Sequence, residues 1–228
     1  DQLSLDNINV TIDPGEIVAL VGPTGVGKST IADMIGGLQK PTAGHVLLGD
    51  MRLEEIQAQQ KNQILAVAFQ ESFLFADTVK ENILLGRDFE ENDIRAALET
   101  AQALEFVEHL PEGINTVLGE RGVSLSGGQR QRITLARALV GEPKIIFLDD
   151  STSSVDPVIE KKILNNLRLH SDVSLLIVAH RLSTIKLADR VIFLNKGKVE
   201  GTGTHEELME SKSYSTLIKA YEINGTIR

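Results

Sequence analysis

The sequence predicts an α/β fold with a mainly parallel central sheet, an antiparallel β portion and an inserted α-helical subdomain. Two observations predict it. Short apolar runs of strand length alternate with helical patterns at both ends of the chain. Between these ends, from about residue 71 to about residue 140, the periodicity is helical. We therefore expect one domain, residues 1–228, whose core comprises residues 1–70 and 141–228 and whose helical subdomain comprises residues 71–140.

The first third of the chain is expected to contain four strands and one helix. Residues 3–12 alternate apolar and polar side chains, as in a half-buried strand, and Asp13-Pro14-Gly15 follows as a turn. Two glycines, Gly36 and Gly37, end the helix. In chain order the expected elements are a strand at 3–12, a strand at 17–21, a helix at 28–35, a strand at 45–48 and a strand at 64–69.

Helices dominate the middle of the chain, and strands return after residue 144. Two helix starts show capping-box spacing, Ser126 with Gln129 and Thr204 with Glu207. Asn195-Lys196-Gly197 is a hairpin turn between two strands. The expected elements are helices at 78–85, 92–104, 130–140 and 157–169, strands at 145–148, 175–179, 191–194 and 198–200, and a helical segment after 204.

Composition limits the classes of function. The net charge is −9, which argues against nucleic acid as the main partner. The chain has no cysteine and therefore no disulfide and no cysteine-based zinc site. No apolar run approaches the roughly 18 residues that a membrane-spanning helix needs.

A phosphate-binding loop is the clearest motif. Gly22-Pro23-Thr24-Gly25-Val26-Gly27-Lys28-Ser29-Thr30 fits the pattern G-x-x-x-x-G-K-[ST], between an apolar strand and a helix. Its glycines let backbone N–H groups turn toward a phosphate, and the helix N-terminus adds partial positive charge. Lys28 can reach the β- and γ-phosphates of a nucleotide, and the Ser29 hydroxyl can hold Mg²⁺.

Two adjacent carboxylates follow the apolar strand at 145–148. Asp149 stands at the carboxyl end of that strand, where an acid paired with a phosphate-binding loop can hold Mg²⁺. Asp150 comes next, and neighbouring side chains at a strand end face different ways. One carboxylate can therefore serve the metal and the other a water molecule.

With these motifs in place, the chain resembles the nucleotide-binding domain of an ABC transporter over essentially its whole length. Leu125-Ser126-Gly127-Gly128-Gln129 is the family's signature motif, and Gln70 matches the Q-loop. Ser154-Val155-Asp156 matches the D-loop, and His180 matches the switch histidine. The resemblance implies a P-loop NTPase core of the RecA-like type, with ATP and Mg²⁺ as cofactors.

The resemblance also implies a role for each motif. The family forms a head-to-tail dimer in which two ATP molecules lie between the P-loop of one domain and the signature motif of the other. Residues 22–30 would then bind one ATP, and Ser126, Gly127, Gly128 and Gln129 would bind the partner's ATP. Gln70 would contact Mg²⁺ or the attacking water, Ser29 and Asp149 would hold Mg²⁺, and His180 would contact the γ-phosphate. Ser154 and Asp156 would communicate across the dimer.

Several stretches are similar to ABC exporters. Gly119-Glu120-Arg121-Gly122 resembles the exporter X-loop, and residues 70–75 and 78–83 resemble the exporter region that meets the coupling helices of the transmembrane domain. A soluble ABC ATPase acting on nucleic acid is the disfavoured alternative. The family's adenine-stacking aromatic residue is missing upstream of the P-loop, so we expect a domain taken from a longer chain with a transmembrane part. Its expected location is the cytoplasmic face of a bacterial inner or plasma membrane.

One residue departs from the family pattern. The family has glutamate after the Walker B aspartate, as the base that polarises water, and Asp150 is one methylene shorter. The missing methylene withdraws the carboxylate by about 1.5 Å, and such a misplacement can lower a rate by about 10²-fold. We therefore favour the slow-site half of a heterodimer. The alternatives are a homodimer that hydrolyses ATP through Asp150, and a nearly non-hydrolytic ATP-binding clamp.

Overall fold

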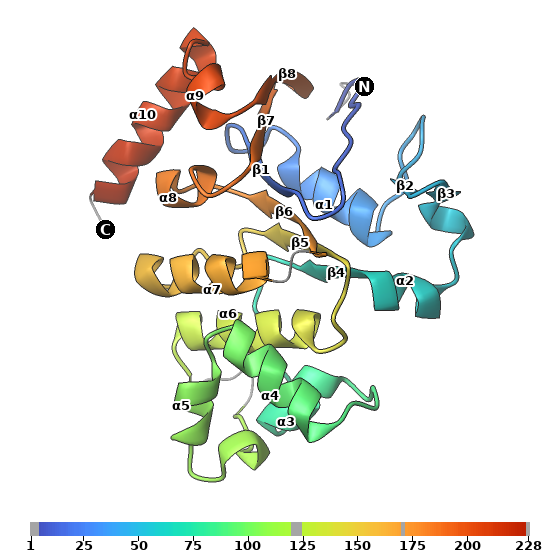
Figure 1. Ribbon diagram of the computed structural model, residues 1–228, viewed down its shortest axis with the longest axis vertical. Helices are drawn as coiled ribbons and strands as arrows, with labels where there is room; N and C mark the ends of the chain where they lie inside the picture. The colour runs from blue at the N-terminus through green and yellow to red at the C-terminus, as the bar shows by residue number, and fades with distance from the viewer. Residues whose placement is uncertain (1–4, 120–124, 170–171, 227–228) are drawn as a thin grey trace. The chain divides into compact units, whose positions relative to one another are not determined.

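The computed structural model describes residues 5–119, 125–169 and 172–226. The chain divides into two compact units, residues 1–61 with 172–228 and residues 62–171. Each unit combines strands with helices (Figure 1), and the helices of the second unit include most of the middle of the chain. The predicted α/β class, with parallel and antiparallel strands, is confirmed.

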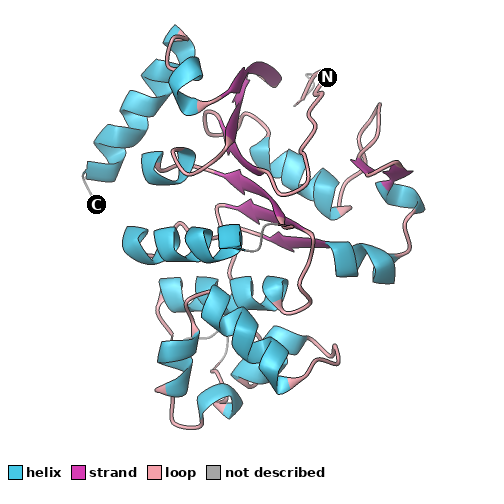
Figure 2. Ribbon diagram, in the orientation of Figure 1, coloured by secondary structure: helices cyan, strands magenta, loops and turns pink. Residues whose placement is uncertain are grey.

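The first unit is built on four neighbouring strands in the order β6-β1-β7-β8 (Figure 2). β1 pairs in parallel with β6 and β7, and β7 pairs antiparallel with β8. All residues of β1 and β6 are buried, as expected for apolar strands covered on both faces. The bounds are β1 Ile17–Val21, β6 Ser174–Val178, β7 Arg190–Asn195 and β8 Lys198–Gly203, with a separate hairpin of β2 Leu47–Leu48 and β3 Met51–Arg52.

Three helices near the C-terminus share one core cluster with these strands. Tyr214 and Ile218 are fully buried in it, and the Tyr214 ring meets the Phe193 ring edge-on at 5.4 Å. The helices are α8 Leu182–Ile185, α9 His205–Leu208 and α10 Lys212–Thr226, while α1 Lys28–Gly36 follows β1 and α2 Ala58–Ile64 follows a short 3₁₀ turn at Leu53–Glu55. The predicted capping box of Thr204 and Glu207 is confirmed at the start of α9.

The second unit pairs two parallel strands and packs helices around α6. β4 Leu65–Ala68 pairs with β5 Ile145–Asp149 so that Ala68 lies opposite Leu148. The long helix α6 Gly127–Leu139 packs against β4 on one side and against α3 and α4. The remaining elements are α3 Val79–Leu84, α4 Glu91–Thr100, α5 Leu104–Glu108, a 3₁₀ turn at Gly113–Asn115, and α7 Pro157–Leu169.

Two sequence-based expectations are wrong. Residues 5–12 form no strand, because the described chain offers them only scattered contacts, such as the hydrogen bond from the Asp6 N–H to the Gly197 carbonyl. The helix expected at 92–104 is two helices, since Gln102 adopts a left-handed conformation with φ of 55°. The helical segment expected after residue 204 is confirmed, and it consists of two helices, α9 and α10. No helix among the described residues is both long enough and apolar enough to cross a bilayer.

Candidate active site

The loop between β1 and α1 has a shape that only glycine permits at its first position. A Cβ atom on Gly22 would lie 2.5 Å from the Leu194 carbonyl oxygen of β7, far closer than any side chain can approach. Gly27 adopts φ of 109° and, without a side chain, cannot cap the first turn of α1. No side chain of Gly27 therefore competes with an anion for the N–H groups of that turn.

Lys28 is folded back over this loop. Its Nζ donates hydrogen bonds to the Gly22 carbonyl at 2.7 Å and the Pro23 carbonyl at 3.0 Å, and only 7% of the residue is exposed. Ser29, the next residue, is exposed. The Lys28 ammonium and the N-terminus of α1 thus belong to the same turn, which fits the nucleotide phosphates expected there.

His180 lies in the same unit, directly after the stretch that leads out of β6. Burial, with a second contribution from the charge of Lys28, lowers the pKa of His180 from 6.5 to about 4. Its ring meets the Tyr221 ring at 5.6 Å. The imidazole is therefore neutral at pH 7, so one ring nitrogen can donate a hydrogen bond and the other can accept one.

This depressed pKa predicts a pH dependence of stability. Between pH 6.5 and about 4 the unfolded chain binds a proton on His180 that the folded chain does not bind. His180 should therefore make the nucleotide-free protein less stable as the pH falls through this window, with a slope of up to one proton. Urea unfolding at several pH values should show a weaker acid destabilisation in His180→Gln. Identical slopes in the two proteins would contradict the buried neutral imidazole.

Gln70 and Asp150 come together in the second unit. Each follows one of the two paired strands, Gln70 after β4 and Asp150 after β5, so the parallel register brings their positions side by side. Gln70 Nε2 donates to Asp150 Oδ2 at 3.4 Å. Asp150 has φ of 48°, in the left-handed region that aspartate tolerates better than most residues. Asp149 ends β5 and is 6% exposed.

The signature motif begins helix α6 through the predicted capping box, which is confirmed. Ser126 Oγ accepts the Gln129 N–H at 3.2 Å, and Gln129 Oε1 accepts the Ser126 N–H at 2.9 Å. The D-loop packs on the two glycines that follow Ser126. A Cβ atom on Gly128 would lie 2.8 Å from the Ser154 carbonyl oxygen, so this backbone approach requires glycine.

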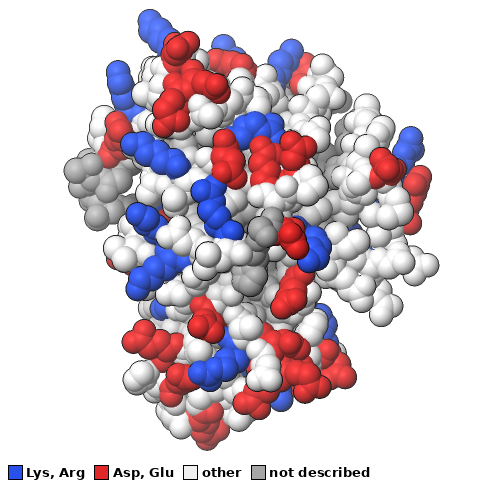
Figure 3. All heavy atoms as spheres, in the orientation of Figure 1, with Lys and Arg blue, Asp and Glu red and all other residues white. Residues whose placement is uncertain are grey.

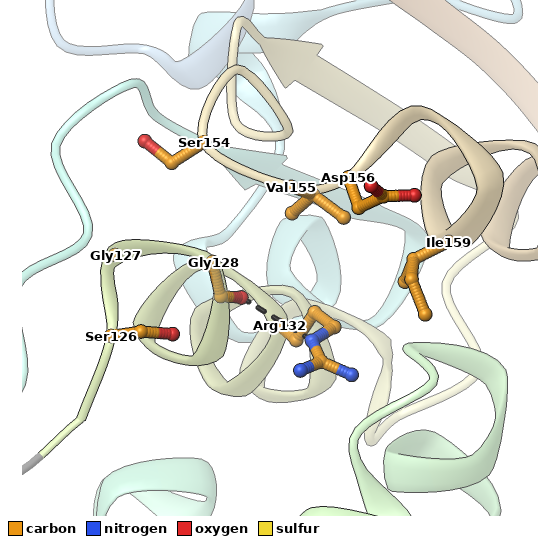
Figure 4. A pocket seen from close by; sticks show the side chains of 8 residues that line it. All are labelled: Ser126, Gly127, Gly128, Arg132, Ser154, Val155, Asp156 and Ile159. Atoms are coloured by element: carbon orange, nitrogen blue, oxygen red, sulfur yellow. Dashed lines mark hydrogen bonds between the residues drawn. The ribbon is translucent and has the colours of Figure 1, made fainter.

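A cavity of about 350 Å³ is lined by the start of α6 and by the D-loop (Figure 4). Arg132 forms its floor, with Nε donating to the Gly128 carbonyl at 3.3 Å and the guanidinium 4.6 Å from the centre of the Phe106 ring. The cavity is lined by Ser126, Gly127, Gly128, Arg132, Ser154, Val155, Asp156 and Ile159. It is of the size that small-molecule sites have.

One buried residue, absent from the sequence-based site, joins the D-loop to α6. Gln131 is 4% exposed; its Oε1 accepts the Ser154 N–H at 2.8 Å and its Nε2 donates to Ser153 Oγ at 3.1 Å. The sequence carries a signal for the burial of Gln131 but not for its D-loop partners, because Gln131 precedes the buried Leu135 and Leu139 at intervals of four residues on one helical face.

Gln131→Met should therefore loosen the D-loop. It removes both side-chain hydrogen bonds while keeping the volume, and we expect the free energy of unfolding to fall by about 1–3 kcal/mol. Chemical denaturation measures the change. Gln59→Met, at an exposed position on α2, is the control and should change stability little. Equal stabilities of Gln131→Met and the parent chain would contradict the structural role of Gln131.

Comparison with known proteins decides the family. Residues 5–153 match the family described as ABC transporter, which is more than half of the 228-residue chain. The chain belongs to the ABC transporter family. Its relatives include an ATP-dependent lipid A-core flippase and a member of the ABC transporter B family, and its structural match is an Atm1-family ABC exporter. The chain is a nucleotide-binding domain of the exporter type.

Two relatives and one solved structure illustrate the match of this ABC domain. It is 41% identical over 93% of its length to the heterocyst differentiation ATP-binding protein HepA of Nostoc sp.. It is 42% identical over 97% of its length to an ATP-dependent lipid A-core flippase of Alkalilimnicola ehrlichii. The chain spans 35% and 38% of these two proteins. A bacterial Atm1-family ABC exporter with ATP bound superposes with a TM-score of 0.87 at 34% identity, over 93% of this chain and 38% of that one.

The ABC motifs fall into both units. The first unit holds residues 22–30 and His180, and the second holds Gln70, Asp149, Asp150 and the signature residues. Of the X-loop, Gly119 is described, whereas Glu120, Arg121 and Gly122 lie outside the described residues.

Proposed function

We propose that this ABC domain binds MgATP and hydrolyses it to power export across a membrane. The observation that carries the proposal is the glycine turn at Gly22, on which Lys28 and the N-terminus of α1 converge. When phosphates enter that turn, their oxygens would replace the loop carbonyls as the hydrogen-bond acceptors of Lys28. The predicted division into a core and a helical subdomain at residues 71–140 is part of the proposal.

In this proposal each site residue has one role. Lys28 and the N–H groups of residues 22–30 bind the phosphates, and Ser29, Gln70 and Asp149 hold Mg²⁺. When bound, Mg²⁺ neutralises charge on the phosphates. Asp150 stands at the position of the base that accepts the proton of the attacking water, and it serves poorly there because its side chain is one methylene shorter than glutamate. Neutral His180 has one ring N–H, which donates a hydrogen bond toward the γ-phosphate oxygen.

The proposal includes a second ABC domain as partner. The cavity beside Ser126 and Gly128 would receive the partner's ATP, because Gly127 and Gly128 expose backbone N–H groups at the start of α6. We favour a heterodimer in which the P-loop of this chain forms the slow site, owing to Asp150. A homodimer that hydrolyses through Asp150, or a nearly non-hydrolytic clamp, is the alternative.

An exposed aromatic pair supports contact with the coupling helices of a transmembrane domain on the cytoplasmic side. Phe73 and Phe75 are 47% and 49% exposed and meet edge-on at 4.9 Å. Their backbone is held by Asn82, whose Oδ1 accepts the Phe75 N–H at 2.8 Å, and by Arg137, whose Nη1 donates to the Phe73 carbonyl at 3.0 Å. Two apolar rings on a rigid backbone suit a protein partner.

The proposed partners do not include nucleic acid. Acidic side chains gather over the helices α3, α4 and α5 (Figure 3), where they would repel a phosphate backbone. The exposed acids of this part of the chain include Glu81, Asp88, Glu90, Glu91, Asp93, Glu99, Glu105 and Glu108.

MgATP binding and hydrolysis by the intact protein test the proposed function. Lys28→Ala should abolish both, whereas Lys40→Ala, which removes an exposed lysine outside the loop, should change neither. A parent chain that binds no MgATP, or a Lys28→Ala chain that hydrolyses it normally, would overturn the proposal.

A further inference from the structure

Helix α10 reaches the phosphate-binding loop through one tyrosine. The Tyr221 hydroxyl donates a hydrogen bond to the Gly22 carbonyl at 3.0 Å, across 199 positions of sequence. The same carbonyl oxygen accepts Lys28 Nζ at 2.7 Å. Gly22 is buried, so its carbonyl depends on these protein donors rather than on bulk water.

The helix that carries Tyr221 is firmly seated. Tyr214 and Ile218 lie seven and three positions before Tyr221 on the same helical face, and both are buried in the cluster formed with β1 and β7. The Tyr214 hydroxyl makes a hydrogen bond with His205 Nδ1 at 3.0 Å. Tyr221 is therefore presented to the loop by a packed helix rather than by a free tail.

The Lys28 ammonium has too few donors to keep its loop hydrogen bonds and also bind two phosphates, and the Tyr221 hydroxyl can make up the difference. An ammonium has three N–H donors, and the Lys28 ammonium donates to two carbonyls of the loop, those of Gly22 and Pro23. Contacts to both a β- and a γ-phosphate bring the acceptors to four. At least one carbonyl must then lose its Lys28 hydrogen bond, and a buried carbonyl left without any donor costs free energy.

We propose that Tyr221 is a positioning residue for nucleotide binding, because it keeps the Gly22 carbonyl hydrogen-bonded when Lys28 turns toward the phosphates. The inference rests on the proposed function, since it assumes that Lys28 binds phosphate. The ring also packs against His180 at 5.6 Å and so holds the imidazole beside the same loop. The C-terminal helix thereby acts on both the loop and the switch histidine of its own domain.

Tyr221→Phe tests the hydroxyl, with Tyr214→Phe as the matched control on the same helix. Tyr221→Phe should raise the dissociation constant for MgATP, and the KM, by about 3- to 10-fold, the effect of one ordinary hydrogen bond. The kcat at saturating MgATP should stay within about 2-fold. Tyr214→Phe loses a hydroxyl that faces His205, and it should bind MgATP as the parent chain does.

Tyr221→Leu separates the ring from the hydroxyl. It removes the contact with His180 as well, so it should lower kcat in addition to raising the KM. Urea unfolding without nucleotide monitors folding in all variants. MgATP affinity unchanged in Tyr221→Phe, or lowered equally in Tyr221→Phe and Tyr214→Phe, would overturn the inference.

The same set of proteins distinguishes this inference from the proposed function. If the parent chain binds MgATP and Lys28→Ala does not, while Tyr221→Phe binds like the parent, only the role of Tyr221 fails. If the parent chain does not bind MgATP, the proposed function fails and the role of Tyr221 fails with it.

Discussion

Asp150→Glu is expected to raise MgATP turnover by about 10- to 100-fold, the largest gain that any single change in this chain should produce. The added methylene advances the carboxylate by about 1.5 Å toward the position that a water-activating base needs. Asp149 and Lys28 are untouched, so the affinity for MgATP should change little. Turnover by the intact protein, alone and with a candidate partner domain, measures the effect.

Two controls make this experiment decisive. Lys28→Ala sets the background rate, and Asp150→Asn removes the base while keeping the shape of the side chain. If Asp150 is idle, Asp150→Asn should hydrolyse ATP as slowly as the parent chain. A parent chain that turns over briskly, gains nothing from glutamate and loses its activity with asparagine would instead make Asp150 the working base of a homodimer. The left-handed backbone at Asp150, with φ of 48°, also predicts a small loss of stability in Asp150→Glu, since glutamate tolerates that conformation less well.

Gly128→Ala should reduce turnover by more than about 10-fold, and it should lower the free energy of unfolding by about 1–3 kcal/mol. The new Cβ atom would lie 2.8 Å from the Ser154 carbonyl oxygen, and a backbone atom cannot yield as a flexible side chain can. The D-loop must therefore move away from α6, and the cavity between them must change shape. Turnover and denaturant unfolding of the purified protein measure the two effects.

Gly127→Ala is the matched control for this prediction. Its Cβ atom would lie 3.4 Å from Ser154 Cβ, which is ordinary van der Waals contact. Both variants keep the backbone N–H groups and both add one methyl group to the same helical turn. If the two alanines proved equally harmful to stability, close packing of the D-loop would not be the reason that Gly128 is glycine.

The elements that could be predicted from the sequence are those in which the spacing of apolar residues itself indicates burial. β1 is a continuous apolar run, β6 is apolar after Ser174, and both are buried throughout. α2 could not be predicted in this way, because it has no buried residue and hence no apolar face to recognise. The break between α4 and α5 has no local signal either, because Gln102, a residue without a strong turn preference, takes the left-handed conformation.

The candidate site shows the same division. Lys28 and Ser126 belong to motifs with fixed spacing, and the local geometry around both matches the spacing. The contacts of Gln131 with the D-loop and of Tyr221 with Gly22 join residues 23 and 199 positions apart. No local pattern encodes such pairs, because they depend on how separate elements pack.

At Ser126, the capping of α6 and the binding of a ligand depend on different atoms of the same hydroxyl group. The Ser126 oxygen accepts the Gln129 N–H, which leaves the hydroxyl proton for a second acceptor. Ser126→Asp would preserve the cap, since aspartate caps helices as well as serine does, but it would present a negative charge where a phosphate is expected. Such a chain should fold and accumulate like the parent chain. Under the proposed function it would lose only the ability to receive the partner's ATP beside Ser126, so a normal yield of folded protein would accompany a loss of nucleotide-dependent pairing.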